Sequence, residues 1–431
     1  MDSLLAARLQ MAISLGFHIL FAVAGMAMPL FMVIAEARYL RTGDTAYRDL
    51  AKRWAKGTAI LFAVGAVSGT VLSFELGLLW PRFMAKAGPL IGMPFSMEGF
   101  AFFLEAIALG IYLYGWERVS PKVHLASGGV VALSGLVSGV FVVAVNAWMN
   151  TPRGFRLTET GAITDVDLWQ AFFTPAFPTQ ATHMALAAYS SVGFAVLGIH
   201  AYRLLRDPGS SFHRSALRVV LPVVLISAPL QVVSGDFSAK HIAAHQPAKL
   251  AAAEALFHTE RGAPLLVGGI PDPEREEVSL ALRLPRMLSV MAKGDPNAEV
   301  SGLDRVPRED WAPVTFTHLS FQVMVASGFA MLGVALWGGL LLLRKKALPE
   351  QRRFLWAATL AAPLGLLAVE AGWMVTEVGR QPWIIHGVMR TKDAVTPMPN
   401  VQISLLVTCL VYLVLGTVVA LLLRRYVAGS S

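Results

Sequence analysis

The chain has 431 residues, of which 55% are hydrophobic and only 15% are charged. A soluble domain has about a quarter charged residues, so this composition excludes an ordinary soluble enzyme and indicates a protein that lies in lipid. The formal net charge of +8 does not indicate a nucleic-acid partner, because the basic residues lie in short loops between apolar blocks. The single cysteine, Cys409, excludes internal disulfides and any cysteine-rich metal site built by this chain alone.

Long apolar blocks predict an all-α membrane bundle of about nine transmembrane helices. The first block, residues 11–35, carries no charge and is long enough to cross a bilayer at about 1.5 Å per residue. No basic segment and cleavage site mark it as a removable signal peptide, so we expect a retained first helix. The predicted spans are 9–37, 58–79, 95–116, 126–149, 180–205, 216–234, 316–343, 354–376 and 401–423.

Loop charges predict the orientation of the bundle. Lysine and arginine gather in the first, third, fifth and seventh loops, which the positive-inside rule places in the cytoplasm. The N-terminus is then outside and the C-terminus cytoplasmic. One long polar loop lies outside, and loops longer than about 15 residues are often functional, so it is a candidate substrate site. We therefore divide the chain into helices one to six (1–235), this outer loop (236–312) and helices seven to nine (313–431).

Several ionisable side chains lie inside the apolar blocks, where their burial is costly and indicates function. The candidates are His18, Glu75, Glu98, Glu105, His183 and Glu370, with Met324 as a soft ligand. In the predicted topology all of them lie in the outer half of the bundle, and Glu105 lies nearest the midplane. Histidine, methionine and carboxylates in an apolar bundle indicate haem, because a His/Met pair suits an electron-transfer iron. Carboxylates at such a site can ligate iron or deliver protons.

Each candidate also has a structural interpretation. A lone histidine can bridge helices, a methionine usually packs in a core, and a glutamate near the interface can reach water. His318 lies two turns from Met324 on the same predicted helix and is its rival as a ligand. We expect His124, His200 and His213 to lie at solvated helix ends. A proton-coupled transporter, or the b-haem membrane anchor of a quinone-linked dehydrogenase, is an alternative function.

The sequence resembles subunit I of the cytochrome bd-type quinol oxidases along essentially its whole length. The matching stretches are RLQMAISLGFHILF with His18, MEGFAFFLEAIALGIYLYGWER with Glu98 and Glu105, NAWMNTPRGF, ATHMALAAY with His183, GDFSAKHIAAHQPAKLAAAEALFHTE in the long loop, FQVMVASGFAML with Met324, and VEAGWMVTEVGRQPW with Glu370. GRQPW with the preceding EAGW, and QPAKLAAAE, are specific to that family.

The resemblance implies an electrogenic quinol:oxygen oxidoreductase that oxidises quinol outside and reduces oxygen with cytoplasmic protons. It implies that His183 and Met324 ligate a low-spin b haem. His18 and Glu370 would ligate the oxygen-reducing pair, with Glu98 beside it, and which of them serves which haem stays open. The remaining implied roles are proton transfer for Glu105 and Ser138, quinol oxidation for Lys249 and Glu254, and a haem propionate contact for Arg380.

The resemblance also implies cofactors, partners and a location. The cofactors are two b haems, one low-spin and one high-spin, and a third haem that is either d or b. The substrates are ubiquinol or menaquinol and dioxygen. The partners are a second large membrane subunit, a small single-helix subunit and membrane lipid, in the bacterial inner membrane. The short outer loop indicates a short-loop member of the family. The stretch EGFAFFLEAI resembles the cyanide-insensitive branch.

Overall fold

Nine segments among the described residues 2–425 are long and apolar enough to cross a membrane, which confirms the predicted number of spans. In this computed structural model they are α1 (Ser3–Thr42), α2 (Thr45–Leu79), α3 (Pro81–Tyr114), α4 (Pro121–Asn150), α6 (Phe177–Arg206), α7 (Ser211–His245), α10 (Val314–Leu343), the pair α11 (Arg352–Ala361) and α12 (Leu364–Val378), and α14 (Val401–Leu423). Most helices are longer than predicted, because a charged residue ends an apolar window without ending a helix.

The eighth span is broken, so the prediction of one continuous helix over 354–376 is wrong at this point. α11 ends at Ala361, and Pro363 stands just before α12. Proline has no amide hydrogen to donate and its ring collides with the preceding turn, which separates the two helices.

Two glycines let α6 pack closely against this broken span. A Cβ added to Gly365 would lie 2.3 Å from Ser191 Cα, and one added to Gly198 would lie 2.5 Å from Ala362 Cβ. Neither distance is possible for a real side chain, so only glycine permits this approach of the helices.

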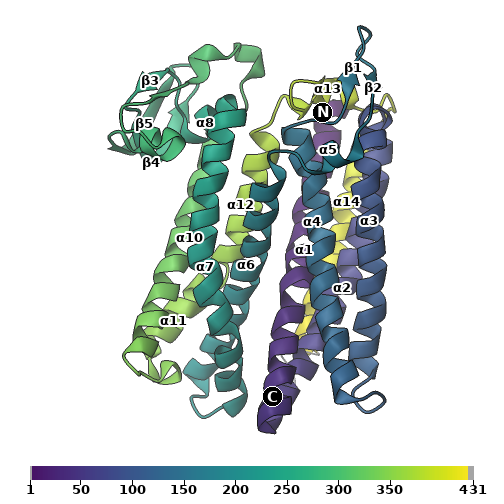
Figure 1. The fold of residues 1–431 in the computed structure, drawn as a ribbon, viewed down its shortest axis with the longest axis vertical. Coiled ribbons are helices and arrows are strands. Elements are labelled where there is room, and N and C mark those ends of the chain that lie inside the picture. Colours follow the sequence, from purple (N-terminus) through teal and green to yellow (C-terminus); the bar gives the residue numbers. More distant parts are fainter. Residues whose placement is uncertain (1, 426–431) are drawn as a thin grey trace.

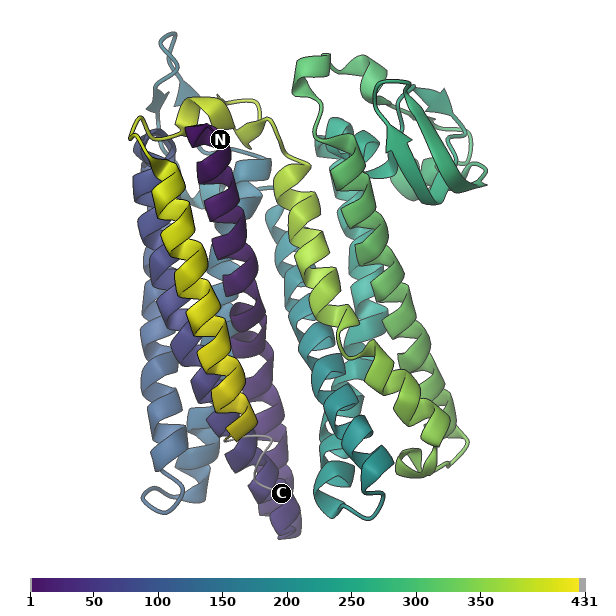
Figure 2. The ribbon, with the colours of Figure 1, turned by 180° about the vertical axis from the view of Figure 1, so that it is seen from behind.

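The helices form two halves that lie side by side in both views of the ribbon (Figures 1 and 2). The first half contains α1 to α4 and α14, and the second contains α6, α7, α10, α11 and α12. A buried apolar cluster joins them, with Phe31 of α1, Phe194 of α6 and Val220 of α7. The N-terminus and the long loop lie at the same end of the bundle, which we call the N-terminal end.

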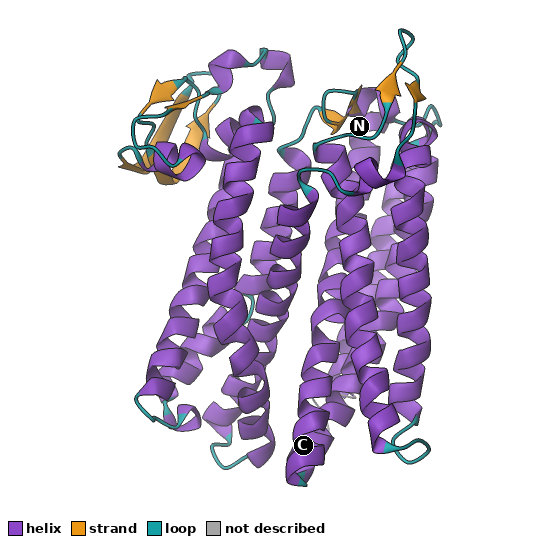
Figure 3. Cartoon of the chain, in the orientation of Figure 1, coloured by secondary structure: helices purple, strands orange, loops and turns teal. Residues whose placement is uncertain are grey.

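The predicted loop 236–312 is folded rather than irregular (Figure 3). α7 continues to His245, so the first ten residues of the loop are helical. The rest forms α8 (Pro247–Glu254), β3 (Glu260–Arg261), β4 (Leu265–Asp272), β5 (Glu277–Leu284), α9 (Met287–Lys293), β6 (Glu299–Val300) and 3-10 turns at Leu303–Arg305 and Arg308–Asp310. β4 and β5 pair antiparallel from Leu265 opposite Leu284 to Asp272 opposite Glu277.

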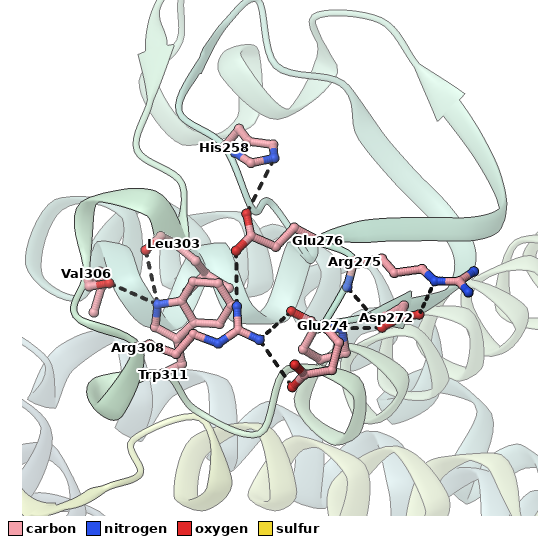
Figure 4. Close-up of polar contacts among 10 residues, drawn as sticks. His258, Asp272, Glu274, Arg275, Glu276, Leu303, Val306, Arg308 and Trp311 are labelled. Atoms are coloured by element: carbon pink, nitrogen blue, oxygen red, sulfur yellow. Dashed lines mark hydrogen bonds and ion pairs between the residues drawn. The ribbon is translucent and has the colours of Figure 1, made fainter.

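Arg308 fastens the turn of this hairpin to the end of the loop (Figure 4). Its guanidinium donates to Glu276 Oε1 at 3.0 Å, Glu274 Oε1 at 3.2 Å and Pro273 O at 2.7 Å. The same guanidinium stacks over Trp311, 4.6 Å from the ring centroid. One planar cation thus holds several acceptors in place, which is the geometry that arginine favours.

Smaller elements complete the fold. They are β1 (Arg156–Leu157), β2 (Ile163–Thr164), α5 (Leu168–Phe172), β7 (Trp383–Ile385), β8 (Met389–Arg390), α13 (Thr391–Ala394) and a 3-10 turn at Leu348–Glu350. Except for the 3-10 turn, these elements lie over the N-terminal end of the first half (Figure 1).

His124 and His200 are buried, so the prediction of solvated helix ends is wrong for both. His124 Nδ1 lies 2.7 Å from Glu36 Oε1, and its Nε2 lies 2.9 Å from Tyr112 O. His124 and Glu36 thus form a buried ion-pair contact, and the second ring nitrogen faces a backbone carbonyl. The pair joins α1 to α4.

We expect His124→Leu to lower the free energy of unfolding by about 3–5 kcal/mol, because it leaves the Glu36 carboxylate buried without its partner. The measurement is thermal unfolding of the detergent-solubilised protein. The double variant Glu36→Met/His124→Leu is the matched control and should regain most of the loss, since it removes both charges. Equal melting temperatures for wild type and His124→Leu would contradict the ion pair.

Candidate functional site

His18 lies on α1 against a serine of α2. Its Nδ1 is 2.9 Å from Ser68 Oγ, and that hydroxyl donates to Val64 O at 2.9 Å. A hydroxyl has one hydrogen, so it accepts from His18 Nδ1–H. The ring is thereby held with Nε2 as the unprotonated nitrogen, which is the form that ligates iron. Gly69 makes room for the ring, since a Cβ there would lie 3.0 Å from His18 Cε1.

His183 on α6 repeats this arrangement against α7. Its Nδ1 is 2.9 Å from Ser234 Oγ, and Ser234 donates to Gln231 O at 2.9 Å. The Nε2 lone pair faces the Gln231 amide nitrogen at 3.1 Å. A Cβ on Gly235 would lie 3.6 Å from the His183 ring. The two halves of the bundle therefore each present one histidine whose Nδ1 lies against a serine hydroxyl of the next helix.

Met324 lies between α10 and α12, and Glu370 lies between α12 and α1. A Cβ on Gly372 of α12 would lie 3.1 Å from Met324 Sδ on α10. A Cβ on Gly16 of α1 would lie 3.2 Å from Glu370 Oε2. Glu370 thus reaches across from α12 to α1, two residues before His18. Its Oε1 is buried and has no hydrogen-bond partner among the described residues.

Glu98 and Glu105 lie along the seam between α3 and α4. Ser138 of α4 donates to Glu98 Oε1 at 3.1 Å. Glu105 is buried, and a Cβ on Gly135 of α4 would lie 3.1 Å from its Oε1. The two glutamates are seven residues apart, so they lie on one helix face about 10 Å apart along the axis. Glu105 is the one farther from the N-terminal end.

The Glu75 side chain does not reach the surface of the chain. Its side chain is buried, and its Oε1 accepts from Gln10 Nε2 at 2.9 Å and from Ser14 Oγ at 2.8 Å. These contacts tie α2 to α1 one helical turn from the level of His18. We assign Glu75 a structural contact.

His318 cannot serve as the rival ligand in this arrangement. Its ring has no exposed surface, and its Nδ1 and Nε2 lie 2.8 Å from Ala253 O and 3.1 Å from Gly268 O. Each ring nitrogen lies within hydrogen-bond distance of a backbone carbonyl of the long loop, so the ring is engaged with that loop. Of the two candidates on α10, Met324 is left.

The N-terminal end of the second half holds a buried polar cluster around Lys249. Lys249 Nζ donates to Asn150 Oδ1 and, at 3.3 Å, to Thr376 O. Arg380 donates to Glu377 Oε2 at 2.5 Å, and Asn146 donates to the other oxygen of Glu377. Burial, with Arg380 nearby, lowers the pKa of Lys249 to about 7. Two basic groups and one carboxylate make this cluster suited to an anionic ligand.

Glu254 ends α8 and is only 1% exposed. Within residues 2–425 neither carboxylate oxygen has a hydrogen-bond partner. Burial raises the pKa of Glu254 to about 8. A carboxyl group that takes up a proton near neutral pH and has unsatisfied oxygens is suited to accept protons from a substrate.

Three serines that support these residues were not predicted as a set, although one sequence signal unites them. The tripeptide Val-Ser-Gly occurs at 67–69, 137–139 and 233–235. Its serine contacts His18, Glu98 and His183 respectively. The asparagines of the Lys249 cluster carry no comparable signal, because polar residues at a helix end are common.

The residues present fit haem. A porphyrin supplies four nitrogens to the iron and needs one or two protein ligands, so it requires no convergent protein cluster. Among the described residues no group of three or more His, Cys, Asp or Glu side chains is placed to hold a metal ion. Glycines stand beside His18, His183 and Met324. Arg380 is buried, and its Nε and Nη1 have no partner in the described part of the chain, as an arginine facing a propionate requires.

Comparison with known proteins gives a consistent result. The family model described as cytochrome bd terminal oxidase subunit I matches residues 6–430. The putative cytochrome bd menaquinol oxidase subunit I of Bacillus subtilis (strain 168) is 37% identical over 433 residues, covering 99% of this chain and 97% of that protein. The cytochrome bd ubiquinol oxidase subunit 1 of the same organism is 29% identical over 454 residues, covering 100% and 95%.

A solved structure agrees with these relatives. The bd oxidase from Geobacillus thermodenitrificans is similar with a TM-score of 0.94 and 39% sequence identity, covering 100% of this chain and 99% of that one. The matches extend over whole chains in both sequence and fold. This chain belongs to the cytochrome bd terminal oxidase subunit I family.

Proposed function

We propose that this chain is the haem-bearing subunit of a terminal oxidase that oxidises quinol at the N-terminal end and reduces oxygen to water. The observation that supports it most is the pair of matched histidines. His18 and His183 lie in different halves, and each donates from Nδ1 to a serine and keeps Nε2 as an acceptor. A transporter has no need of two such histidines. A b-haem anchor has no need of the glutamates of the α3/α4 seam.

We infer that His183 and Met324 hold a low-spin b haem, and that His18 and Glu370, with Glu98 beside them, hold the oxygen-reducing pair. This assignment is supported by the approach of the Glu370 carboxylate to Gly16 of α1, two residues before His18. When bound, these haems would supply electron transfer and oxygen binding, with a high-spin b haem and a third haem of type d or b in the pair.

Quinol oxidation is assigned to the folded loop. Lys249 and Arg380 provide positive charge, which stabilises the negative charge that develops as a quinol loses its protons. Glu254 accepts a proton, because its pKa of about 8 lies near the pH of the reaction. Arg380 also has guanidinium nitrogens left to bind a propionate.

Proton delivery is assigned to Glu105, Glu98 and Ser138 along the α3/α4 seam. Ser138 holds the Glu98 carboxylate, and Glu105 lies about two turns farther from the N-terminal end. Because the positive-inside rule places that end outside, protons would be taken from the cytoplasm and released outside. Charge would cross the membrane by this separation of the two reactions. We propose the bacterial inner membrane, a second large subunit and a small single-helix subunit as the setting.

The test uses the purified complex. We expect b-type bands in reduced-minus-oxidised spectra and oxygen uptake that depends on added quinol. A protein without haem bands would support the transporter instead. Haem bands without quinol-dependent oxygen uptake would support the dehydrogenase anchor.

A further inference from the structure

Two side chains one turn apart on α10 hold the long loop by its backbone. The His318 nitrogens lie 2.8 Å from Ala253 O and 3.1 Å from Gly268 O. Gln322 donates to Leu266 O at 3.0 Å and accepts from Gly268 N–H at 2.9 Å. These contacts, with the Thr315 hydroxyl that donates to Pro271 O at 3.1 Å, join α10 to both α8 and β4, at a place where His318 is fully buried.

The points held by these bonds lie next to residues of the proposed reaction. Ala253 directly precedes Glu254 in α8. Gln322 lies two residues before Met324, so the two are about 3 Å apart along the axis of α10. One helix thus carries both the candidate haem ligand and the groups that fix the backbone beside the candidate proton acceptor.

Backbone contacts suit this task because they fix position without taking part in the chemistry. Leu266 and Gly268 belong to the hairpin, and Ala253 belongs to the helix that carries Glu254, so one side chain spans two separate pieces of the loop. Small displacements matter here, since a shift of about 1 Å in a reacting group can cost about 10²-fold in rate.

We propose that His318 and Gln322 are positioning residues that hold the quinol-oxidising loop in register with the Met324 helix. They touch neither the substrate nor a haem in this role. The inference rests on the proposed function, because it assigns the loop to quinol oxidation. It adds two residues for which the resemblance implies no role in quinol oxidation.

The test compares His318→Phe, which keeps a ring and removes both hydrogen bonds, with His318→Gln, whose amide still donates to carbonyls. We expect kcat/KM for quinol to fall at least tenfold in His318→Phe and in Gln322→Leu, and to recover mostly in His318→Gln. Hydrogen exchange of the amides in 249–254 and 265–272 should rise in the first two variants. Reduced-minus-oxidised spectra and the single-turnover reaction of dithionite-reduced protein with oxygen should match wild type.

The matched control is His258→Phe, the same substitution at an exposed histidine of the same loop, which should leave every readout unchanged (Figure 4). Wild-type kcat/KM and exchange in His318→Phe would overturn the proposal. Loss of haem bands in that variant would also overturn it, because His318 would then serve a haem or the fold of the bundle. If the wild-type complex oxidises no quinol, the proposed function fails, and hydrogen exchange alone still decides whether the residues hold the loop.

Discussion

Replacing Met324 with leucine should remove the low-spin haem signal and, with it, quinol-dependent oxygen uptake. Leucine has nearly the same volume as methionine, so the packing of α10 against Gly372 is kept while the sulfur is lost. The iron would lose its sixth ligand and change to a high-spin form. The measurement is the reduced-minus-oxidised spectrum of the purified complex together with steady-state oxygen uptake.

The control for this substitution is Met331→Leu, at a buried methionine two turns along the same helix. It changes the same chemical group in the apolar core, and we expect a wild-type spectrum. A wild-type spectrum in Met324→Leu would show that Met324 is not a ligand. His183 would then need another partner, and α10 would carry no haem ligand.

Glu254→Gln should lower quinol-dependent oxygen uptake by about 10²-fold or more, the usual contribution of a general base. Glutamine has the same shape as glutamic acid but cannot accept the proton. Because burial raises the pKa of Glu254 to about 8, roughly a tenth of the molecules carry the carboxylate at pH 7 and half at pH 8. The ratio of wild-type to variant rate should therefore rise about fivefold between these pH values.

Two further observations make this test specific. Any dependence of the oxygen-uptake rate on pH that remains in Glu254→Gln belongs to other groups. Lys249 is one of them, because its charge is lost as the pH rises through about 7. The exposed Glu277 of β5 provides the control, since Glu277→Gln makes the same chemical substitution in the same loop away from the buried carboxyl group. A wild-type to variant ratio that stays flat with pH would remove Glu254 as the proton acceptor.

The number of helices could be predicted from the sequence, but the break in the eighth span and the burial of the helix ends could not. Apolar runs such as 11–35 specify a span without reference to any neighbour, which explains why the number of spans was right. The break before α12 was missed because Pro363 alone does not distinguish a kink from two helices. His124 was misjudged because the depth of a helix end depends on what packs over it, which no local pattern contains.

The candidate site was predicted as a set of residues and not as a geometry. Intramembrane ionisable groups are rare enough to stand out, so His18, His183 and Glu105 were visible in the sequence. The serine that fixes each histidine lies on another helix, 50 residues from His18 and 51 from His183, and only the fold brings them together. The role of Gln322 was equally hidden, because its partners are backbone atoms of a distant strand.

The close approach of α6 to the broken eighth span has a consequence for tolerated sequence change. α6 carries His183 and α12 carries Glu370, and their separation is set partly by Gly198 and Gly365. Most positions on these helices can drift among apolar residues of similar size. At these two positions even alanine would push the helices apart, although neither glycine contacts His183 or Glu370. When variants of this chain are ranked for harm, Gly198 and Gly365 therefore belong beside the candidate ligands.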